Sequence, residues 1–415
     1  MAENMDGAIV KFTFLDKADG TTLLSPSALT VTVDLPAAYK AALQSQNETL
    51  YNALATQLPY ENSLTIPATT YTADDGGEGI IYLAIPDKIA AIAEIPTFAS
   101  YVDDIKSNIE ITLTATVGDD TYKLTQTGFP FVNGQYHRIK AKMKKQAPEG
   151  AIDGKFTINS NGNQVYFSQG NLQATCTAAD GDGGTQETWT WAFAEHQYDY
   201  VGNAVANTAI DGNGSVSTAG TVDLFGWSTA ATYFGINNST DEGDYSGDFV
   251  DWGSLAITNG GNTANSGWRM LTSAEWTYLF DTRTASTVGG TDNGRYAKAT
   301  VNGVSGVILF PDSYTHPDGV TAPASVNTNT ANFTANSYDA TAWGKMETAG
   351  AVFLPAARYR SGSSVLSSSY TEYWSSSPLD ASSVYYVYIS ESDLAPQFTS
   401  ARYYGRLVRL VRAAE

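Results

Sequence analysis

The sequence predicts a mainly β chain with a few helices, arranged as two domains. Apolar and polar residues alternate in many short runs, and only a few stretches have helical spacing. Alternation with a period of two is typical of strands that bury one face. A Pro-Glu-Gly segment at 148–150 separates two differently patterned parts. We therefore expect a first domain at 1–147, a linker at 148–153 and a second domain at 154–415.

The composition disfavours several classes of partner. Acidic residues outnumber basic ones by 43 to 23, whereas a nucleic-acid partner calls for a basic stripe. We expect neither a nucleic-acid partner nor an anionic membrane partner. The chain lacks an apolar run of about 18 residues, so we expect no direct membrane span. Abundant Thr, Ser, Asn, Gly and Tyr indicate a secreted or surface-displayed protein. Residues 1–10 have no apolar export signal, which suggests a trimmed form.

The first domain should be mostly strands around one helical stretch. Residues 36–57 have apolar residues near helical spacing, and Pro36 suits a helix start. The last expected strand carries a basic face. The expected strands are 8–14, 29–35, 79–85, 109–117, 120–127 and 136–145.

This first domain resembles the fimbrillin-type pilins of Bacteroides-like bacteria. The likeness rests on FPFVNGQYHRIKAKMKKQ at 129–146, where an aromatic–Asn–Gly turn leads into alternating basic and apolar residues. The resemblance implies a β-sandwich and possible pilin-subunit partners. Such pilins usually carry two sandwich domains and this chain has one, so it could be a tip or an anchored relative. A generic β-sandwich spacer is the alternative.

The second domain opens with a hairpin at 154–173, whose Asn161-Gly162 turn is a strong hairpin signal. Residues 174–265 lack periodicity but carry Trp residues, so we expect irregular structure packed by aromatic side chains. We expect Cys176, the lone cysteine, to be small and buried. Helices are expected at 271–281, capped by Thr272 or Ser273, and at 341–350, ending at Gly350; strands are expected at 304–312 and 351–360.

The second domain resembles the C-type lectin fold, in the subtype of the formylglycine-generating enzymes. The motifs are GWRMLTSAEWTYLF (267–280), GVILFPD (306–312), GAVFLPAARYRSG (350–362), YWSSSP (373–378) and YYGRLVRLVR (403–412). More narrowly, it is similar to the variable proteins of diversity-generating retroelements, in which a reverse transcriptase rewrites adenine-containing codons near the end of the gene. The block at 405–412 resembles the fixed end of that variable segment.

Residues 359–404 suit a binding surface on their own evidence. About half are Ser or Tyr, and Asn and Lys are absent. Tyr supplies rigid amphipathic contact area and Ser supplies adaptable hydrogen bonds. In the strand 384–392, alternation places Tyr385, Val387 and Ile389 on the core side. We expect Tyr373 and Trp374 to be core residues as well.

The candidate ligand-binding residues lie on the other face of that strand and on the loops 360–372, 377–383 and 395–404. They are Tyr359, Ser361, Ser364, Ser367, Ser369, Tyr370, Glu372, Leu379, Asp380, Ser382, Ser383, Tyr386, Tyr388, Ser390, Ser392, Phe398, Thr399, Ser400, Tyr403 and Tyr404.

The leading hypothesis is a cell-surface or extracellular receptor, on a fimbrium or anchored at the outer membrane. Its retroelement-diversified surface would bind a protein, or a glycan as the second choice. One alternative is a pilus-tip or structural adhesin with a fixed ligand. Another is a solvated Ser/Tyr surface with no partner.

No enzymatic chemistry is expected. The related sulfatase-modifying enzymes depend on cysteines near the C-terminus, and this chain has none there. His137, His196 and His316 lie far apart in sequence, without the spacing of a triad. The calcium motifs of sugar-binding C-type lectins are missing. We expect no catalytic residue, metal or cofactor, although the acidic loop 241–251 leaves a calcium site open.

Overall fold

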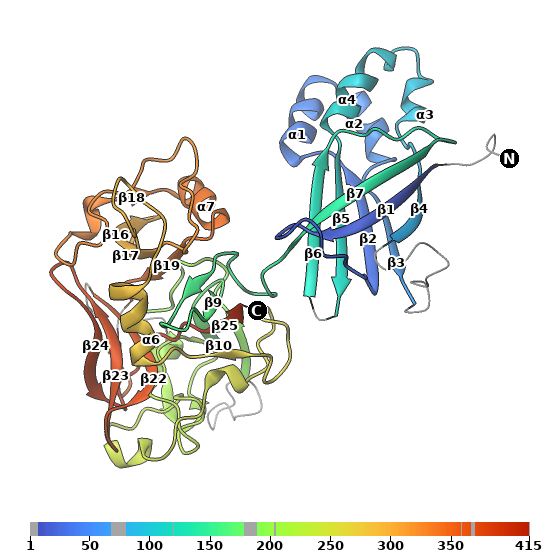
Figure 1. Cartoon of the computed structure of the whole chain (residues 1–415). Helices are drawn as coiled ribbons and strands as arrows, with labels where there is room; N and C mark the ends of the chain where they lie inside the picture. Colours follow the sequence, from blue (N-terminus) through green and yellow to red (C-terminus); the bar gives the residue numbers. More distant parts are fainter. Residues whose placement is uncertain are drawn as a thin grey trace. The chain divides into compact units, whose positions relative to one another are not determined.

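The computed structural model describes residues 7–67, 80–118, 120–177, 189–202, 205–357, 359–366 and 370–414. The protein is β-rich, with 38% strand and 17% helix. The chain divides into two compact units, residues 1–146 and 147–415. Figure 1 shows both, and each is described here by itself. Within the described ranges, no helix has the length and apolar character needed to cross a membrane.

The first unit is built on one seven-stranded sheet in the order β3-β2-β5-β6-β7-β1-β4. Every strand expected from the sequence is present, and β3 was not expected. The strands are β1 Ala8–Asp16, β2 Ala28–Asp34, β3 Tyr60–Thr65, β4 Ile80–Ile85, β5 Glu110–Val117, β6 Asp120–Thr127 and β7 Tyr136–Lys145.

The seven strands form one curled sheet, and the β-sandwich implied by the pilin resemblance stays a prediction. Strand β7 pairs with β1 along eight positions but with β6 only at Tyr122–Lys145 and Lys123–Lys144. The β4-β1-β7 arm can therefore turn away from the rest of the sheet. Phe12 on β1 lines the same apolar cavity as Ile111 and Leu113 on β5, so the two arms share one core.

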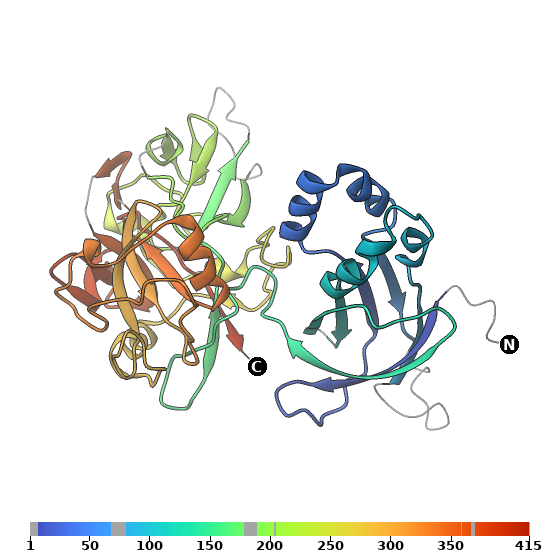
Figure 2. The same ribbon diagram turned by 90° about the horizontal axis from the view of Figure 1, so that it is seen from above.

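Helices gather at one end of this sheet (Figures 1 and 2). The single helix expected at 36–57 is two helices, because Asn47 adopts a non-helical conformation and its side chain accepts a hydrogen bond from the Leu50 amide at 3.0 Å. Pro36 precedes the first of them, as expected. The helices are α1 Ala37–Gln46, α2 Glu48–Ala55, α3 Ala90–Ala93, η3 Ala99–Tyr101 and α4 Val102–Asn108.

The second unit consists of short sheets joined by long irregular segments. Its sheets have the orders β11-β10-β14, β12-β13, β15-β25-β9-β8, β18-β16-β17-β19, β20-β21 and β22-β23-β24. Its strands are β8 Phe156–Thr157, β9 Gln164–Phe167, β10 Leu172–Cys176, β11 Trp189–Phe193, β12 Ile210–Gly212, β13 Ser215–Val216, β14 Gly220–Val222, β15 Trp268–Arg269, β16 Tyr296–Val301, β17 Val304–Leu309, β18 Ser337–Tyr338, β19 Val352–Pro355, β20 Tyr359–Ser361, β21 Ser364–Leu366, β22 Thr371–Pro378, β23 Ser383–Ile389, β24 Leu394–Ala401 and β25 Val411–Ala414.

The helices of this unit are short, and the two that the sequence predicts are present. Thr272 caps α6 in a capping box with Glu275, and Gly350 follows α7 with a φ of +90°. The helices are α5 Val205–Thr208, η5 Glu242–Tyr245, η6 Trp252–Ser254, α6 Ser273–Thr277, the π-helix η7 Tyr278–Thr282, η8 Phe333–Ala335 and α7 Ala340–Thr348.

The sheet β22-β23-β24 lies between two hydrophobic clusters. Tyr373, Val387 and Ile389 belong to one cluster. Trp374 and Tyr386 belong to the other, which also holds Trp227, Trp252 and Cys176. The central residues of β22 and β23 therefore pack against a hydrophobic cluster on each face of the sheet. Exposed side chains of this sheet concentrate on β24 and at the turns.

Candidate ligand-binding surface

Six aromatic side chains from the predicted binding segment meet in one continuous row. Successive ring centroids lie 4.4, 5.7, 6.1, 5.1 and 5.3 Å apart. Phe398 is 47% exposed, and the five tyrosines are half-buried. We call this set the aromatic row; in order its members are Tyr403, Tyr404, Tyr359, Tyr370, Tyr388 and Phe398.

The row is assembled from segments that are distant in sequence. Tyr359 lies on β20, Tyr388 on β23 and Phe398 on β24. Tyr403 and Tyr404 follow β24 in a turn, and Gly405 then forms a bridge with Arg360 of β20. This bridge holds the Tyr403–Tyr404 turn beside Tyr359. The aromatic surface therefore depends on the fold and is not a local property of one loop.

The buried side chain of Arg406 packs against the inner side of the aromatic row. Arg406 is 3% exposed, and its guanidinium carbon lies 4.4 Å from the ring centre of Trp374, 4.0 Å from Tyr386 and 5.3 Å from Tyr404. Its Nε lies 2.9 Å from Oε2 of Glu372, which compensates the buried charge. Burial nevertheless raises the pKa of Glu372, because desolvation outweighs the attraction of Arg406.

Two predicted contact residues are corrected by this arrangement. Glu372 and Tyr386 are each 5% exposed. The prediction assumed that one face of β23 meets solvent, whereas both faces are packed. Tyr386 contacts Trp374 and Phe398, so it supports the aromatic row from within. Val387, Ile389, Tyr373 and Trp374 are buried, as expected.

The other predicted residues within the described ranges lie on a hairpin, on β24 and at the two turns that flank β23. Ser361 and Ser364 lie on the β20–β21 hairpin, and Thr399 and Ser400 lie on β24. Leu379, Asp380, Ser382 and Ser383 form the β22–β23 turn, whereas Ser390 and Ser392 form the β23–β24 turn. At about 3.4 Å per residue the two turns are on the order of 20 Å apart. Ser367 and Ser369 fall outside the described residues.

Lys298 is a supporting residue that the sequence did not reveal. It lies on β16 and is buried, and its ammonium donates to the carbonyl oxygens of Asn329, Ser390 and Asp393. It therefore fixes the β23–β24 turn to another sheet. Desolvation lowers its pKa to about 8. A lone lysine within the apolar run YAKATV was the available signal.

Arg402 performs a similar role at the other turn. Its guanidinium lies 4.3 Å from the Trp227 ring centre. It donates to the carbonyl oxygens of Tyr245 at 3.2 Å, Gly247 at 3.1 Å and Asp380 at 2.5 Å. The β22–β23 turn is thus attached to the irregular segment near residue 245.

Two tyrosines of the aromatic row, Tyr370 and Tyr403, have raised pKa values. A hydrogen bond with Tyr404, together with burial, raises the pKa of Tyr403 to about 12. Burial raises the pKa of Tyr386 to about 12 and also raises that of Tyr370. The hydroxyls of Tyr370 and Tyr403 are therefore neutral near pH 7, and together with the ring faces of the row they suit hydrogen bonding and packing.

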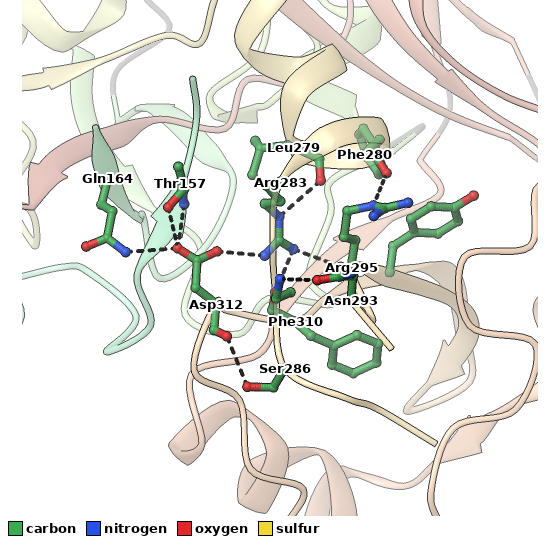
Figure 3. Close-up of polar contacts among 12 residues, drawn as sticks. Thr157, Gln164, Leu279, Phe280, Arg283, Ser286, Asn293, Arg295, Phe310 and Asp312 are labelled. Atoms are coloured by element: carbon green, nitrogen blue, oxygen red, sulfur yellow. Dashed lines mark hydrogen bonds and ion pairs between the residues drawn. The ribbon is translucent and has the colours of Figure 1, made fainter. Parts of the chain in front are cut away.

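A second charged cluster, around Arg283 and Asp312, is structural (Figure 3). Arg283 donates to Asp312 Oδ1 at 2.9 Å and to the carbonyl oxygens of Leu279, Arg295 and Phe310. Asp312 Oδ2 accepts from the amide and hydroxyl of Thr157 and from Gln164. Burial lowers the pKa of Arg283 to about 10. Each charged group is matched by protein partners, which joins the β8–β9 hairpin to the segments after η7 and β17.

Three carboxylates of the acidic loop 241–251 accept hydrogen bonds from the protein itself. Asp241 accepts a hydrogen bond from the Gly243 amide at 2.9 Å and Asp244 accepts one from Ser239 at 2.5 Å. Asp251 accepts from the amides of Gly253 and Met270. Across the described part of the chain, no group of three His, Cys, Asp or Glu side chains is placed to hold a metal ion.

No protein-family model, curated protein or solved structure matches this chain.

Proposed function

We propose that the second unit is a ligand-binding domain. Its contact surface is the aromatic row together with the predicted serines of the β20–β21 hairpin and of β24. The single observation that carries this proposal is the row itself. Exposed aromatic side chains that gather in one place usually mark an interaction site. Tyr is enriched at such sites because its ring gives contact area at a small entropic cost.

The ligand in this proposal is a protein. The aromatic row draws its rings from β20, β23, β24 and the turn after β24, and a surface assembled from so many segments fits a broad epitope. Rigid support favours affinity because less conformational entropy is lost on binding. Trp374 and Arg406 supply that support below the row.

The proposal includes diversification of the surface by a retroelement. Its basis is the Ser/Tyr composition of 359–404, placed just before the GRLVRLVR block at 405–412. A layout in which buried residues hold the fold and exposed ones vary would tolerate many surface sequences. The first unit, with its pilin-like terminal strand, would display the binding domain at the cell surface.

The gene neighbourhood tests the diversification. We expect a near-identical copy of codons 359–412 beside a reverse-transcriptase gene, with differences at adenine positions. A neighbourhood without such a copy would reject diversification and leave a fixed adhesin.

A binding experiment tests the surface itself. A library of proteins displayed by neighbouring cells would be screened against the full chain, and each hit retested with Tyr388→Ala and Phe398→Ala. Loss of binding of about tenfold or more is expected for both. Lys345→Ala, on the exposed face of α7, is the matched control. Ligands whose binding is unchanged by both aromatic substitutions would show that the aromatic row is not the contact surface.

A further inference from the structure

The outer face of the first unit carries a concentration of basic side chains, which is unexpected in a chain with a formal charge of −20. On β7, exposed Tyr136, Arg138, Lys140 and Lys142 alternate with His137, Ile139, Ala141 and Met143. Ala141 and Met143 are fully buried. The alternation therefore aims the basic set away from the core.

Neighbouring strands extend this basic set sideways. In the sheet register, Lys11 of β1 lies between Arg138 of β7 and Tyr82 of β4. Figure 1 shows these three strands side by side. On the other side of β7, Lys123 pairs in register with Lys144. We call Lys11, Tyr82, Lys123, Tyr136, Arg138, Lys140 and Lys142 the basic face.

The cations of the basic face differ from three other lysines of the same unit, which are paired with carboxylates. Lys40, Lys106 and Lys145 of the same unit form ion pairs with carboxylates at 2.6–2.8 Å. No ion pair within the described ranges involves Lys11, Lys123, Arg138, Lys140 or Lys142. Like charges directly opposite one another on adjacent strands are destabilising. The pair Lys11–Arg138 therefore has an energetic cost that an anionic partner would remove.

Two exposed tyrosines add a second kind of contact. Tyr82 is 53% exposed and Tyr136 is 49% exposed. The Lys11 ammonium lies 5.6 Å from the Tyr82 ring centre, and the Arg138 guanidinium lies 5.6 Å from that of Tyr136. Each ring thus adjoins a cation, so one ligand unit could pack on the ring and place an acidic group on the cation.

We propose that the basic face binds a linear acidic polysaccharide. Cations on alternate positions of β7 recur about every 6.6–6.8 Å. That spacing fits a polymer with one acidic group or fewer per sugar ring, and the tyrosine rings provide flat apolar contacts for the sugars. A nucleic acid carries a far denser row of charges, which the acidic remainder of the chain would repel. This binding is independent of the ligand of the aromatic row.

The test is titration calorimetry of the full chain with polygalacturonate, a linear polymer with one carboxylate per sugar ring, and with its methyl ester as the matched uncharged probe. We expect binding of polygalacturonate alone, with affinity that falls as salt increases. Lys140→Glu should weaken binding by about fivefold or more. Lys345→Glu, which changes the net charge equally but lies in the second unit, should leave it unchanged. Tyr82→Ala should weaken binding without changing its salt dependence.

Several outcomes would overturn the proposal. The first is absence of binding to polygalacturonate. The second is an equal loss of affinity for Lys140→Glu and Lys345→Glu, and the third is equal binding of the uncharged methyl ester. Equal or tighter binding of single-stranded DNA, or of vesicles containing phosphatidylglycerol, would assign the face to another anion. Thermal melts check folding, and Lys142→Glu replaces Lys140→Glu if that variant does not fold.

Discussion

Tyr386 and Tyr388 are two residues apart on β23 and lie on the same side of it, yet they differ in role. Tyr386 is 5% exposed between Trp374, Phe398 and Arg406, whereas Tyr388 is half-buried in the aromatic row. Alternation identifies the side on which a residue lies. It does not identify how deeply that side is covered, which depends on segments far away in sequence.

These two tyrosines give the first prediction. Tyr386→Ala should lower the free energy of unfolding by about 3–5 kcal/mol, because it leaves a cavity and removes a ring from the buried Arg406. Tyr388→Ala should cost about 1 kcal/mol or less. Urea denaturation measures both, and Tyr386→Phe, which keeps the ring, is the control. Equal losses for the two alanine variants would contradict this assignment of roles.

Asp223 gives a prediction about pH. It is fully buried, accepts hydrogen bonds from Val201 and Asn207, and has a pKa raised by burial to about 6. Since the unfolded pKa is lower, the folded state retains the proton more tightly. The contribution of this group to stability is therefore largest below about pH 4 and falls as pH rises to about 6.

The comparison with Asp223→Asn isolates that effect. The variant does not titrate and loses one hydrogen bond, so it should be less stable than the parent at pH 4. The difference in free energy of unfolding between the parent and the variant should shrink by on the order of 1–3 kcal/mol between pH 4 and pH 7. Urea midpoints at both pH values measure it. A difference that is constant or grows with pH would contradict the raised pKa.

At the scale of elements, the sequence predicts a strand or helix best where one of its faces is exposed to solvent. The six expected strands of the first unit are present because their apolar residues alternate cleanly, as in β5. The cap of α6 is local chemistry, so Thr272 and Glu275 reveal it. Patterning fails for β23, which is covered on both faces, and at Asn47, where one residue ends a helix and caps the next.

The candidate surface was partly predictable for the same reason. Its composition identifies the segment, and the six rings of the aromatic row were all among the expected contacts. Glu372 and Tyr386 were misplaced, because their burial depends on Arg406 and Trp374 meeting them in three dimensions. The role of Lys298 depends on contacts 92 residues away at Ser390, which no local pattern encodes.

Lys298 therefore supplies a prediction about the β23–β24 turn. Lys298→Met should lower the free energy of unfolding by about 1–3 kcal/mol, because carbonyl groups lose a charged donor. Hydrogen exchange should accelerate at the Ser390 amide, which donates to Asp393 at 2.9 Å. Lys345→Met, on the exposed face of α7, should have little effect. Unchanged exchange at Ser390 would show that Lys298 does not hold the turn.

At the scale of the whole molecule, each unit has its own hydrophobic core. One cluster lies entirely within the first unit and three lie within the second. We therefore expect fragments 1–146 and 147–415 to fold separately, with melting curves that together reproduce that of the full chain. A fragment 147–415 without a cooperative transition would contradict this division. The same fragment should still bind the ligand of the aromatic row but should not bind polygalacturonate.

The central claim is that the aromatic row is a diversified binding surface on a fixed support. Sequencing the gene from sibling strains tests it most directly. We predict differences concentrated at exposed or half-buried positions such as Tyr359, Tyr388, Phe398 and Tyr404. Trp374, Val387, Ile389 and Arg406 should remain unchanged. Differences spread evenly over buried and exposed positions, or none within 359–404, would contradict the claim.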